Sequence, residues 1–152
     1  MDEIDVKILE LLETNGRISH EEISKQLNMS RPAIRQRILK LEETGVIKGY
    51  NTTIDWSKVG QGIRAIILIK VKTGDFNKLM EQIIHLNVDG LTIEKCYRIT
   101  GQWCIMLQMR ASITDQITQL HDEMLKIEGI LETFTMLILS ETNKYKGDLL
   151  NE

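Results

Sequence analysis

The sequence predicts an α+β protein: an N-terminal helix-turn-helix (winged-helix-like) domain followed by a C-terminal ferredoxin-like βαββαβ domain. Two observations predict this fold. Apolar residues recur at helical spacing in three short segments before residue 45, and a short turn separates the second from the third. From residue 63 onward, strand and helix patterns follow one another in the order β-α-β-β-α-β, which is the order of the split β-α-β unit.

We expect four segments along the chain. Residues 1–48 form the helical domain, and residues 49–62 form a linker strand or hinge that ends in Gly60-Gln61-Gly62. Residues 63–142 form the ferredoxin-like domain, and residues 143–152 form a polar tail.

The first two helices are predicted from their apolar spacing and their end signals. The first covers residues 2–13 and ends near Asn15-Gly16, which is a turn signal. Ser19 and Glu22 match the S-x-x-E capping box and open the second helix, in which Ile23 is an apolar position.

The third helix begins at Ser30 and is the segment that most informs function. The Ser30 hydroxyl can accept a hydrogen bond from a free N–H of the first turn, where Pro32 is also tolerated. Gly45 is expected to end the helix with a positive φ. Three residues at spacings of four and three line the buried face: Ile34, Ile38 and Leu41.

The other faces of this helix are basic although the chain as a whole carries a net charge of −3. A local cluster of cations inside a slightly acidic protein suits the phosphates of double-stranded DNA, although most charge runs are merely solvated surface. We expect Ser30 to contact a phosphate, and Pro32, Ala33 and Gln36 to face base edges. The expected phosphate contacts are Arg31, Arg35, Arg37 and Lys40.

The segment after this helix is rich in β-branched and aromatic residues. Val46-Ile47 and residues 50–54 read as two short strands around Lys48-Gly49. They would form either a small wing beside the helices or a linker strand.

The remainder supplies four strands and two helices. We expect strands at residues 63–73, 91–99, 102–110 and 131–140, with a hairpin at Thr100-Gly101. Asp75 and Ser112 are the expected N-caps of the two helices. Both helices would cover one sheet face, and the other would carry six large apolar residues: Ile66, Leu68, Met106, Phe134, Met136 and Ile138. Because a monomer rarely exposes so large an apolar patch, we expect a homodimer.

Other classes of site lack support in the sequence. Cys96 and Cys104 lack metal-ligand or C-x-x-C spacing, and His20, His85 and His121 form no metal or catalytic motif, so we expect no metal site and no enzyme. The G-x-G-x-x-A pattern at residues 60–65 precedes a strand instead of following one, so no cofactor is expected. No apolar run reaches membrane-spanning length and the N-terminus is acidic, so the expected location is cytoplasmic, without membrane contact.

Four stretches carry a family resemblance. They are IDVKILELLETNGRIS, SRPAIRQRILKLEETGVIKGY, the Ile99-Thr100-Gly101 triplet before Trp103, and Thr133-Phe134-Thr135. In these the chain resembles the Lrp/AsnC family of transcription regulators. The resemblance implies operator binding, a C-terminal effector and assembly domain, and homodimers that assemble further, often to octamers.

The resemblance also implies an amino-acid effector site near the loop between the second and third sheet strands. Its carried-over residues are Ile99, Thr100, Gly101, Gln102, Trp103, Cys104, Thr133 and Thr135. The family often has acidic residues where this chain has Gln102 and Cys104, and a carboxylate is the natural partner of an ammonium group. Two interpretations of the loop therefore stay open: an effector site of altered geometry, or a tight turn without a ligand. The alternative for the whole chain is a metabolite sensor or enzyme on the same fold without operator binding.

Overall fold

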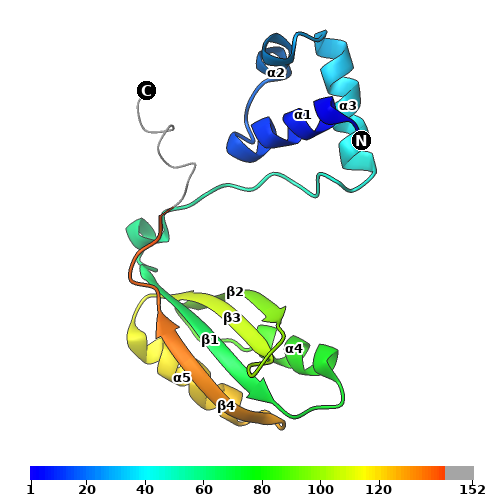
Figure 1. The fold of residues 1–152 in the computed structure, drawn as a ribbon. Helices are drawn as coiled ribbons and strands as arrows, with labels where there is room; N and C mark the ends of the chain where they lie inside the picture. Colours follow the sequence, from blue (N-terminus) through cyan, green and yellow to red (C-terminus); the bar gives the residue numbers. More distant parts are fainter. Residues whose placement is uncertain (143–152) are drawn as a thin grey trace. The chain divides into compact units, whose positions relative to one another are not determined.

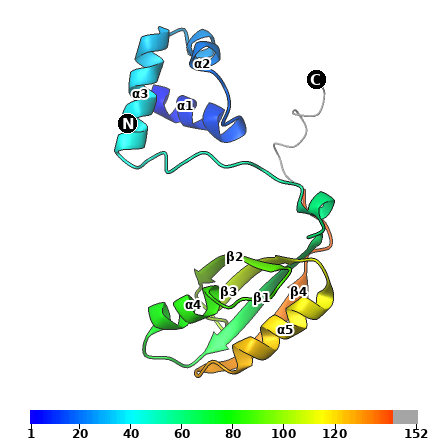
Figure 2. The ribbon, with the colours of Figure 1, turned by 180° about the vertical axis from the view of Figure 1, so that it is seen from behind.

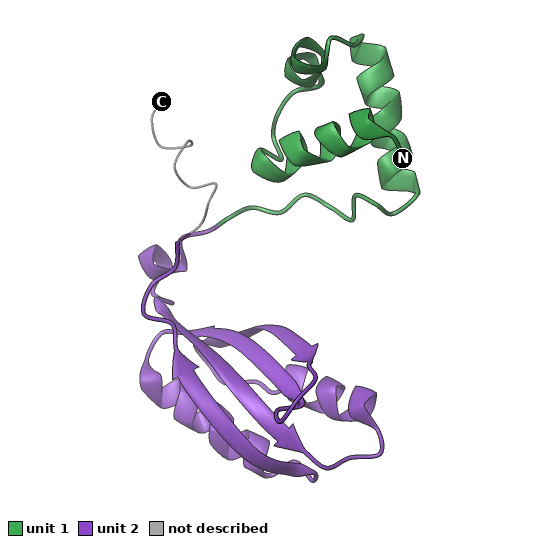
Figure 3. Ribbon diagram, in the orientation of Figure 1, with its two compact units in different colours: residues 1–53, 144–152 green, residues 54–143 purple. Residues whose placement is uncertain are grey.

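The computed structural model describes residues 1–142 and divides them into two compact units, Met1–Thr53 and a second that begins at Ile54 (Figures 1 and 3). The predicted tail, residues 143–152, lies outside the described residues. Each unit has its own apolar core.

The first unit contains three helices: α1 (Glu3–Thr14), α2 (His20–Leu27) and α3 (Arg31–Glu43). Its core consists of five buried residues, at least one from each helix: Ile8, Ile23, Ile34, Ile38 and Leu41. The predicted buried face of α3 is therefore confirmed. Short connections and one shared core hold α2 and α3 as the helix-turn-helix pair.

The helix starts follow the local signals in the sequence. Ser19 and Glu22 form a reciprocal capping box, and the Ser30 hydroxyl accepts a hydrogen bond from the Ala33 N–H at 3.3 Å. Asn28 adopts the left-handed conformation at the turn between α2 and α3. These contacts satisfy N–H groups that a helix start leaves without a backbone partner.

The chain leaves α3 as predicted but does not form the predicted strands. Gly45 has a φ of +71° directly after the helix, and the Ile47 N–H donates to the Leu41 carbonyl at 3.0 Å. No strand is present between residues 46 and 55, so the expected wing or linker strand is wrong. β-Branched residues favour extended backbone, but a strand also needs a neighbour, and this stretch pairs with none among the described residues.

The second unit is an antiparallel four-stranded sheet with two helices. It contains β1 (Ile63–Val71), α4 (Phe76–Ile84), β2 (Leu91–Arg98), β3 (Ile105–Ala111), α5 (Thr114–Leu125) and β4 (Ile130–Leu137). The strand order is β2-β3-β1-β4, which confirms the predicted ferredoxin-like fold. Both helices lie on one face of the sheet (Figures 1 and 2). A short 3₁₀ helix, η1 (Trp56–Val59), precedes β1.

Strand alternation divides the sheet into a covered and an open face. On β1, Ala65, Ile67 and Ile69 are fully buried against the helices. The residues between them face the other side and stay partly exposed, as the alternation predicts.

The start of α5 differs from the prediction. The helix begins at Thr114, and Ser112 is not its cap. The Gln116 side-chain oxygen instead accepts hydrogen bonds from the Ser112 and Ile113 N–H groups, at 2.9 and 3.1 Å. The Ser112 hydroxyl donates to the Gly90 carbonyl. The helix start therefore lacks a side-chain cap, and Gln116 in the first turn binds the two N–H groups that precede the helix.

Among the described residues, no helix combines the length and the apolar character needed to cross a bilayer.

Candidate nucleic-acid interface

The exposed face of α3 is defined by the residues opposite its buried stripe. A helix turns by about 100° per residue, so four residues of α3 point within roughly 60° of a common mean direction about its axis: Pro32, Arg35, Gln36 and Leu39. All four are exposed, whereas the buried stripe on the other side holds the helix against α1 and α2. The packing of the core therefore fixes which side chains of α3 reach solvent.

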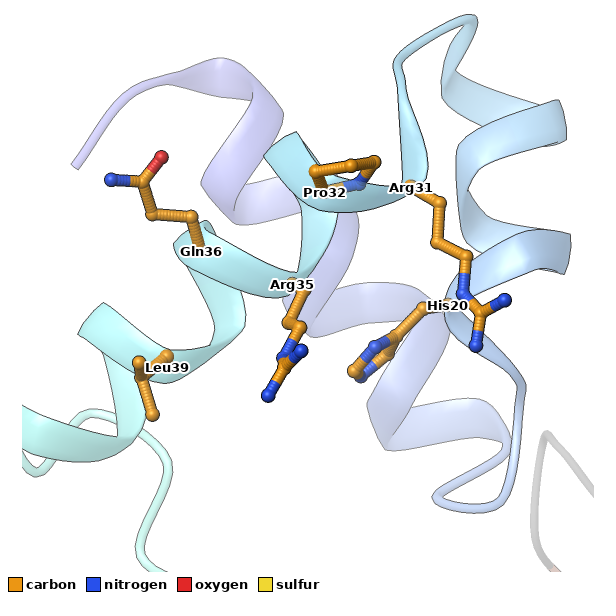
Figure 4. A pocket seen from close by; sticks show the side chains of 6 residues that line it. All are labelled: His20, Arg31, Pro32, Arg35, Gln36 and Leu39. Atoms are coloured by element: carbon orange, nitrogen blue, oxygen red, sulfur yellow. The ribbon is translucent and has the colours of Figure 1, made fainter.

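This face lines a groove of about 590 Å³ together with the starts of α2 and α3 (Figure 4). Figure 4 shows Arg31, Arg35 and His20 extending into one region, with Gln36 directed away from them. Six residues line the groove: His20, Arg31, Pro32, Arg35, Gln36 and Leu39. Four of them are among the predicted DNA-binding residues.

Two lining residues, His20 and Leu39, are absent from the sequence-based set. Leu39 lies four residues after Arg35, so helical spacing alone could have placed it on the same face. His20 comes from α2, and only the packing of α2 against α3 brings it to the groove.

Three predicted cations, Arg31, Arg35 and Lys40, are exposed and make no ion pair within residues 1–142. Lys40 does not line the groove. At the helix start, Ser30 caps the first turn and Ala33 is half-buried beneath it.

Arg37 differs from the other cations because it is already paired. Its Nη1 lies 2.8 Å from an Asp2 carboxylate oxygen and 2.7 Å from one of Asp5, which ties α3 to the start of α1. The pKa values of both carboxyls are lowered, first by their reciprocal backbone hydrogen bonds and then by Arg37. Arg37 therefore holds α3 against the start of α1 through these two ion pairs.

The predicted effector loop is a six-residue connection between β2 and β3 with a defined path. The Ile99 N–H donates to the Cys104 carbonyl, and the Cys104 N–H donates to the Ile69 carbonyl, each at 2.9 Å. Gly101 has a φ of +107°. The Trp103 ring stacks on Phe134, with centroids 6.1 Å apart, so it lies on the open face of the sheet. β2 ends at Arg98 and β3 begins at Ile105, so the connection is longer than the predicted turn at Thr100-Gly101. Gln102 is exposed within this connection.

Within one chain, Thr133 and Thr135 face the other side of the sheet. They pair with Ile69 and Ile67, whose side chains are buried beneath the helices. The Thr133 hydroxyl forms a hydrogen bond with Nε2 of His121 on α5. The structure therefore gathers residues 99–104 and Phe134 on the open face, and the two threonines on the covered face.

A polar cluster centred on Arg110 fastens η1 to the sheet. The Arg110 guanidinium lies 3.7 Å from the Trp56 ring centroid and donates to Gln61 at 2.7 Å and to Glu94 at 2.8 Å. The Arg110 and Glu94 side chains are only 15% and 18% exposed. No residue of this cluster was predicted, because the contacts join segments distant in sequence.

Comparisons with known proteins match both units. Residues 1–48 match the family model described as winged helix-turn-helix DNA-binding, and residues 64–147 match the Lrp/AsnC ligand binding domain.

Named relatives match along nearly the whole chain. HTH-type transcriptional regulator FL11 of Pyrococcus furiosus is 32% identical over 139 residues, which cover 91% of this chain and 89% of that protein. HTH-type transcriptional regulator LrpC of Bacillus subtilis is 31% identical over 147 residues, or 97% of each chain. The LrpC structure superimposes with a TM-score of 0.76, covering 95% of this chain and 98% of that one. The structure of E. coli AsnC, 25% identical, gives 0.79 with 93% of each chain covered.

Proposed function

Because the chain belongs to the Lrp/AsnC family of transcriptional regulators, we propose that the exposed face of α3 is the surface with which it reads DNA. The chain is a DNA-binding transcriptional regulator whose second unit is a ligand-binding domain. The observation that carries the proposal is the groove on the exposed face of α3, which Arg31, Arg35 and Gln36 all line, with the two arginines extending into one region and Gln36 directed away from them. A helix fits the major groove of B-DNA, where each base pair shows a distinct pattern of groups.

The free cations would hold the phosphates. Arg31, Arg35 and Lys40 are exposed and unpaired within the described residues, so each can bind a phosphate without first breaking an ion pair. Ser30 would add a phosphate contact beside its capping role. Arg37 would set the angle of α3 through Asp2 and Asp5 rather than meet the duplex directly.

Base recognition would come from the start and middle of the helix. Gln36 can form two hydrogen bonds with the N6 and N7 groups of adenine. Pro32 and Ala33 are small and carry no side-chain donor, so they would let the helix start approach the base edges closely.

The test is a mobility-shift titration of the full chain against DNA fragments selected for binding. Arg35→Ala should weaken binding to all sequences, whereas Gln36→Ala should change the preferred sequence in a randomised library. Lys7→Ala, an exposed charge on α1, is the matched control and should change neither. An unaltered affinity and preference in both test variants would overturn the assignment of this face.

The open face of the sheet would pack against a second copy of the chain. The strand register aligns Tyr97, Met106, Leu68 and Phe134 in one row, of which Phe134 is 51% exposed. An apolar row of this length is rarely left exposed on a monomer, whereas it is typical of the core of a dimer interface. A two-fold pair would present two α3 helices to two half-sites, and such dimers would assemble further, to an octamer.

Sedimentation tests this surface. Phe134→Lys should shift the chain toward monomer and weaken binding to paired half-sites, whereas Lys95→Ala, an exposed residue of β2, should leave the assembly unchanged. A Phe134→Lys chain that sediments as the wild type would contradict the proposal.

The effector would be an amino acid or a related small metabolite bound at residues 99–104. Gln102 is exposed in this loop and offers an amide oxygen where a carboxylate is usual, so the contact to an ammonium group would be weaker. Because Thr133 and Thr135 lie on the other face of their own sheet, they would reach a ligand only if it also contacts that side or a neighbouring copy. Thermal-shift measurements against the twenty amino acids test binding, since a ligand of the folded state raises stability. Gln102→Ala should weaken any response.

We propose no enzymatic role and a cytoplasmic location, where the chain meets the chromosome. The named relatives are transcriptional regulators. Retardation of DNA from upstream of its own gene would favour regulation over the sensor or enzyme alternative.

A further inference from the structure

Leu39 is the one large aliphatic side chain among the six residues that line the α3 groove. It is 50% exposed, although every other leucine or isoleucine of α3 is buried in the core. A single exposed leucine is ordinary on a protein surface. Leu39 differs from such a residue because it lies in a groove otherwise lined by cationic and polar groups and a proline.

Helix geometry puts Leu39 at the centre of the exposed face. At about 100° per residue it lies roughly 20° from Pro32, 40° from Arg35 and 60° from Gln36. Arg35 and Gln36 lie on opposite sides of it, so Leu39 occupies the line along which the helix would approach the floor of the major groove. Pro32 lies about 10 Å back along the same line.

We propose that Leu39 contacts the 5-methyl group of a thymine and so adds a thymine to the sequence that the chain prefers. The thymine methyl is the apolar group that a standard base pair displays in the major groove, and apolar side chains read it by contact. The inference rests on the proposed function, because it requires that the α3 face enter the groove. It goes further by adding a specificity residue that makes no hydrogen bond.

The geometry also places that thymine relative to the base read by Gln36. Leu39 follows Gln36 by three residues, about 4.5 Å along the helix axis. This is close to the 3.4 Å spacing of stacked bases, so the two side chains address neighbouring base pairs. An adenine at the Gln36 position and a thymine in the adjacent pair, on either strand, is the expected half-site core.

Replacing thymine by uracil tests the contact because it removes only the methyl group. The full chain is first used to select its preferred duplex from a random library. Each thymine of that duplex is then replaced singly by uracil, and the affinity is measured for the wild type, for Leu39→Ala and for the matched control Gln36→Ala.

One uracil substitution should weaken wild-type binding about four-fold, the effect of one buried methyl group. The same substitution should leave Leu39→Ala binding unchanged, while Gln36→Ala keeps the four-fold response. Circular dichroism of Leu39→Ala should match the wild type, because the side chain lies outside the core.

Two results would overturn the inference while leaving DNA binding intact. One is a selected site with no thymine beside the adenine; the other is an equal uracil response in the wild type and Leu39→Ala. Failure of the chain to bind any selected duplex would instead overturn the proposed function, and this inference with it.

Discussion

The structure reduces the number of cations free to bind phosphate, and the salt dependence of DNA binding measures that number. Of the four basic residues in α3, Arg37 is paired with Asp2 and Asp5, so three per chain remain for phosphates. A dimer on two half-sites would then neutralise about six phosphates, and the logarithm of affinity should fall with that of salt at a slope of about −5.4.

Two single variants separate the free cations from the paired one. Arg35→Ala removes one contact from each half-site, and the slope should flatten to about −3.6. Between 50 and 200 mM salt, affinity would then fall by about two decades instead of about three. Arg37→Gln should leave the slope near the wild-type value, because the Arg37 guanidinium is already paired with the Asp2 and Asp5 carboxylates of the same chain.

Fluorescence anisotropy with a labelled duplex, repeated at five or six salt concentrations, gives these slopes directly. Lys7→Ala serves as the charge-matched control on α1. If Arg37→Gln flattens the slope as much as Arg35→Ala does, then Arg37 leaves its aspartates on binding, and the bracing role is wrong. If neither variant changes the slope, α3 does not face the phosphates.

Three further outcomes follow from the packing and the charges. Ile38→Ala should lower the free energy of unfolding of the first unit by about 2–5 kcal/mol, which is comparable to the whole stability of a unit this small. Circular dichroism should therefore show a loss of helix, and DNA binding should vanish. Retained binding would contradict the assignment of Ile38 to the core. Arg110→Ala leaves the poorly exposed Glu94 carboxylate without its cation, with the hydrogen bond from Gln108 remaining, and should lower the melting temperature of the second unit, which calorimetry can detect; an unchanged transition would remove Arg110 as an anchor. Because the folded pKa values of Asp2 and Asp5 lie below 3.8, their contribution is present above that pH and is lost as pH falls through the lowered values; Asp5→Asn should make acid unfolding of the first unit less steep, and an identical acid curve would count against the pairing.

The features that could be predicted from the sequence are those encoded by neighbouring residues. Two helix starts are capped by a hydrogen bond between residues three apart, Glu22 to Ser19 and Ala33 to Ser30. The local sequence pattern therefore predicts where these helices begin. The alternation along β1 likewise determines which side chains are buried once one sheet face is covered.

The features that could not be predicted depend on contacts between distant segments. From the sequence, Arg37 is predicted to be a fourth phosphate contact, because its actual partners, Asp5 and Asp2, lie 32 and 35 residues earlier in the chain and give no local signal. The residues after Gly45 have the composition of strands, but composition does not supply a pairing partner. Ser112 has the chemistry of a cap, yet the helix begins one residue later than a Ser112 cap requires, and the Ser112 N–H instead donates to the Gln116 side chain.

Site-specific cross-linking tests most directly whether the α3 face meets DNA. A photoreactive residue placed at Gln36 in the full chain should cross-link to the selected duplex within a half-site, whereas the same residue at Glu10, exposed on α1, should give no cross-link there. A duplex cross-linked equally from both positions, or from Glu10 alone, would show that another surface of the protein contacts the DNA.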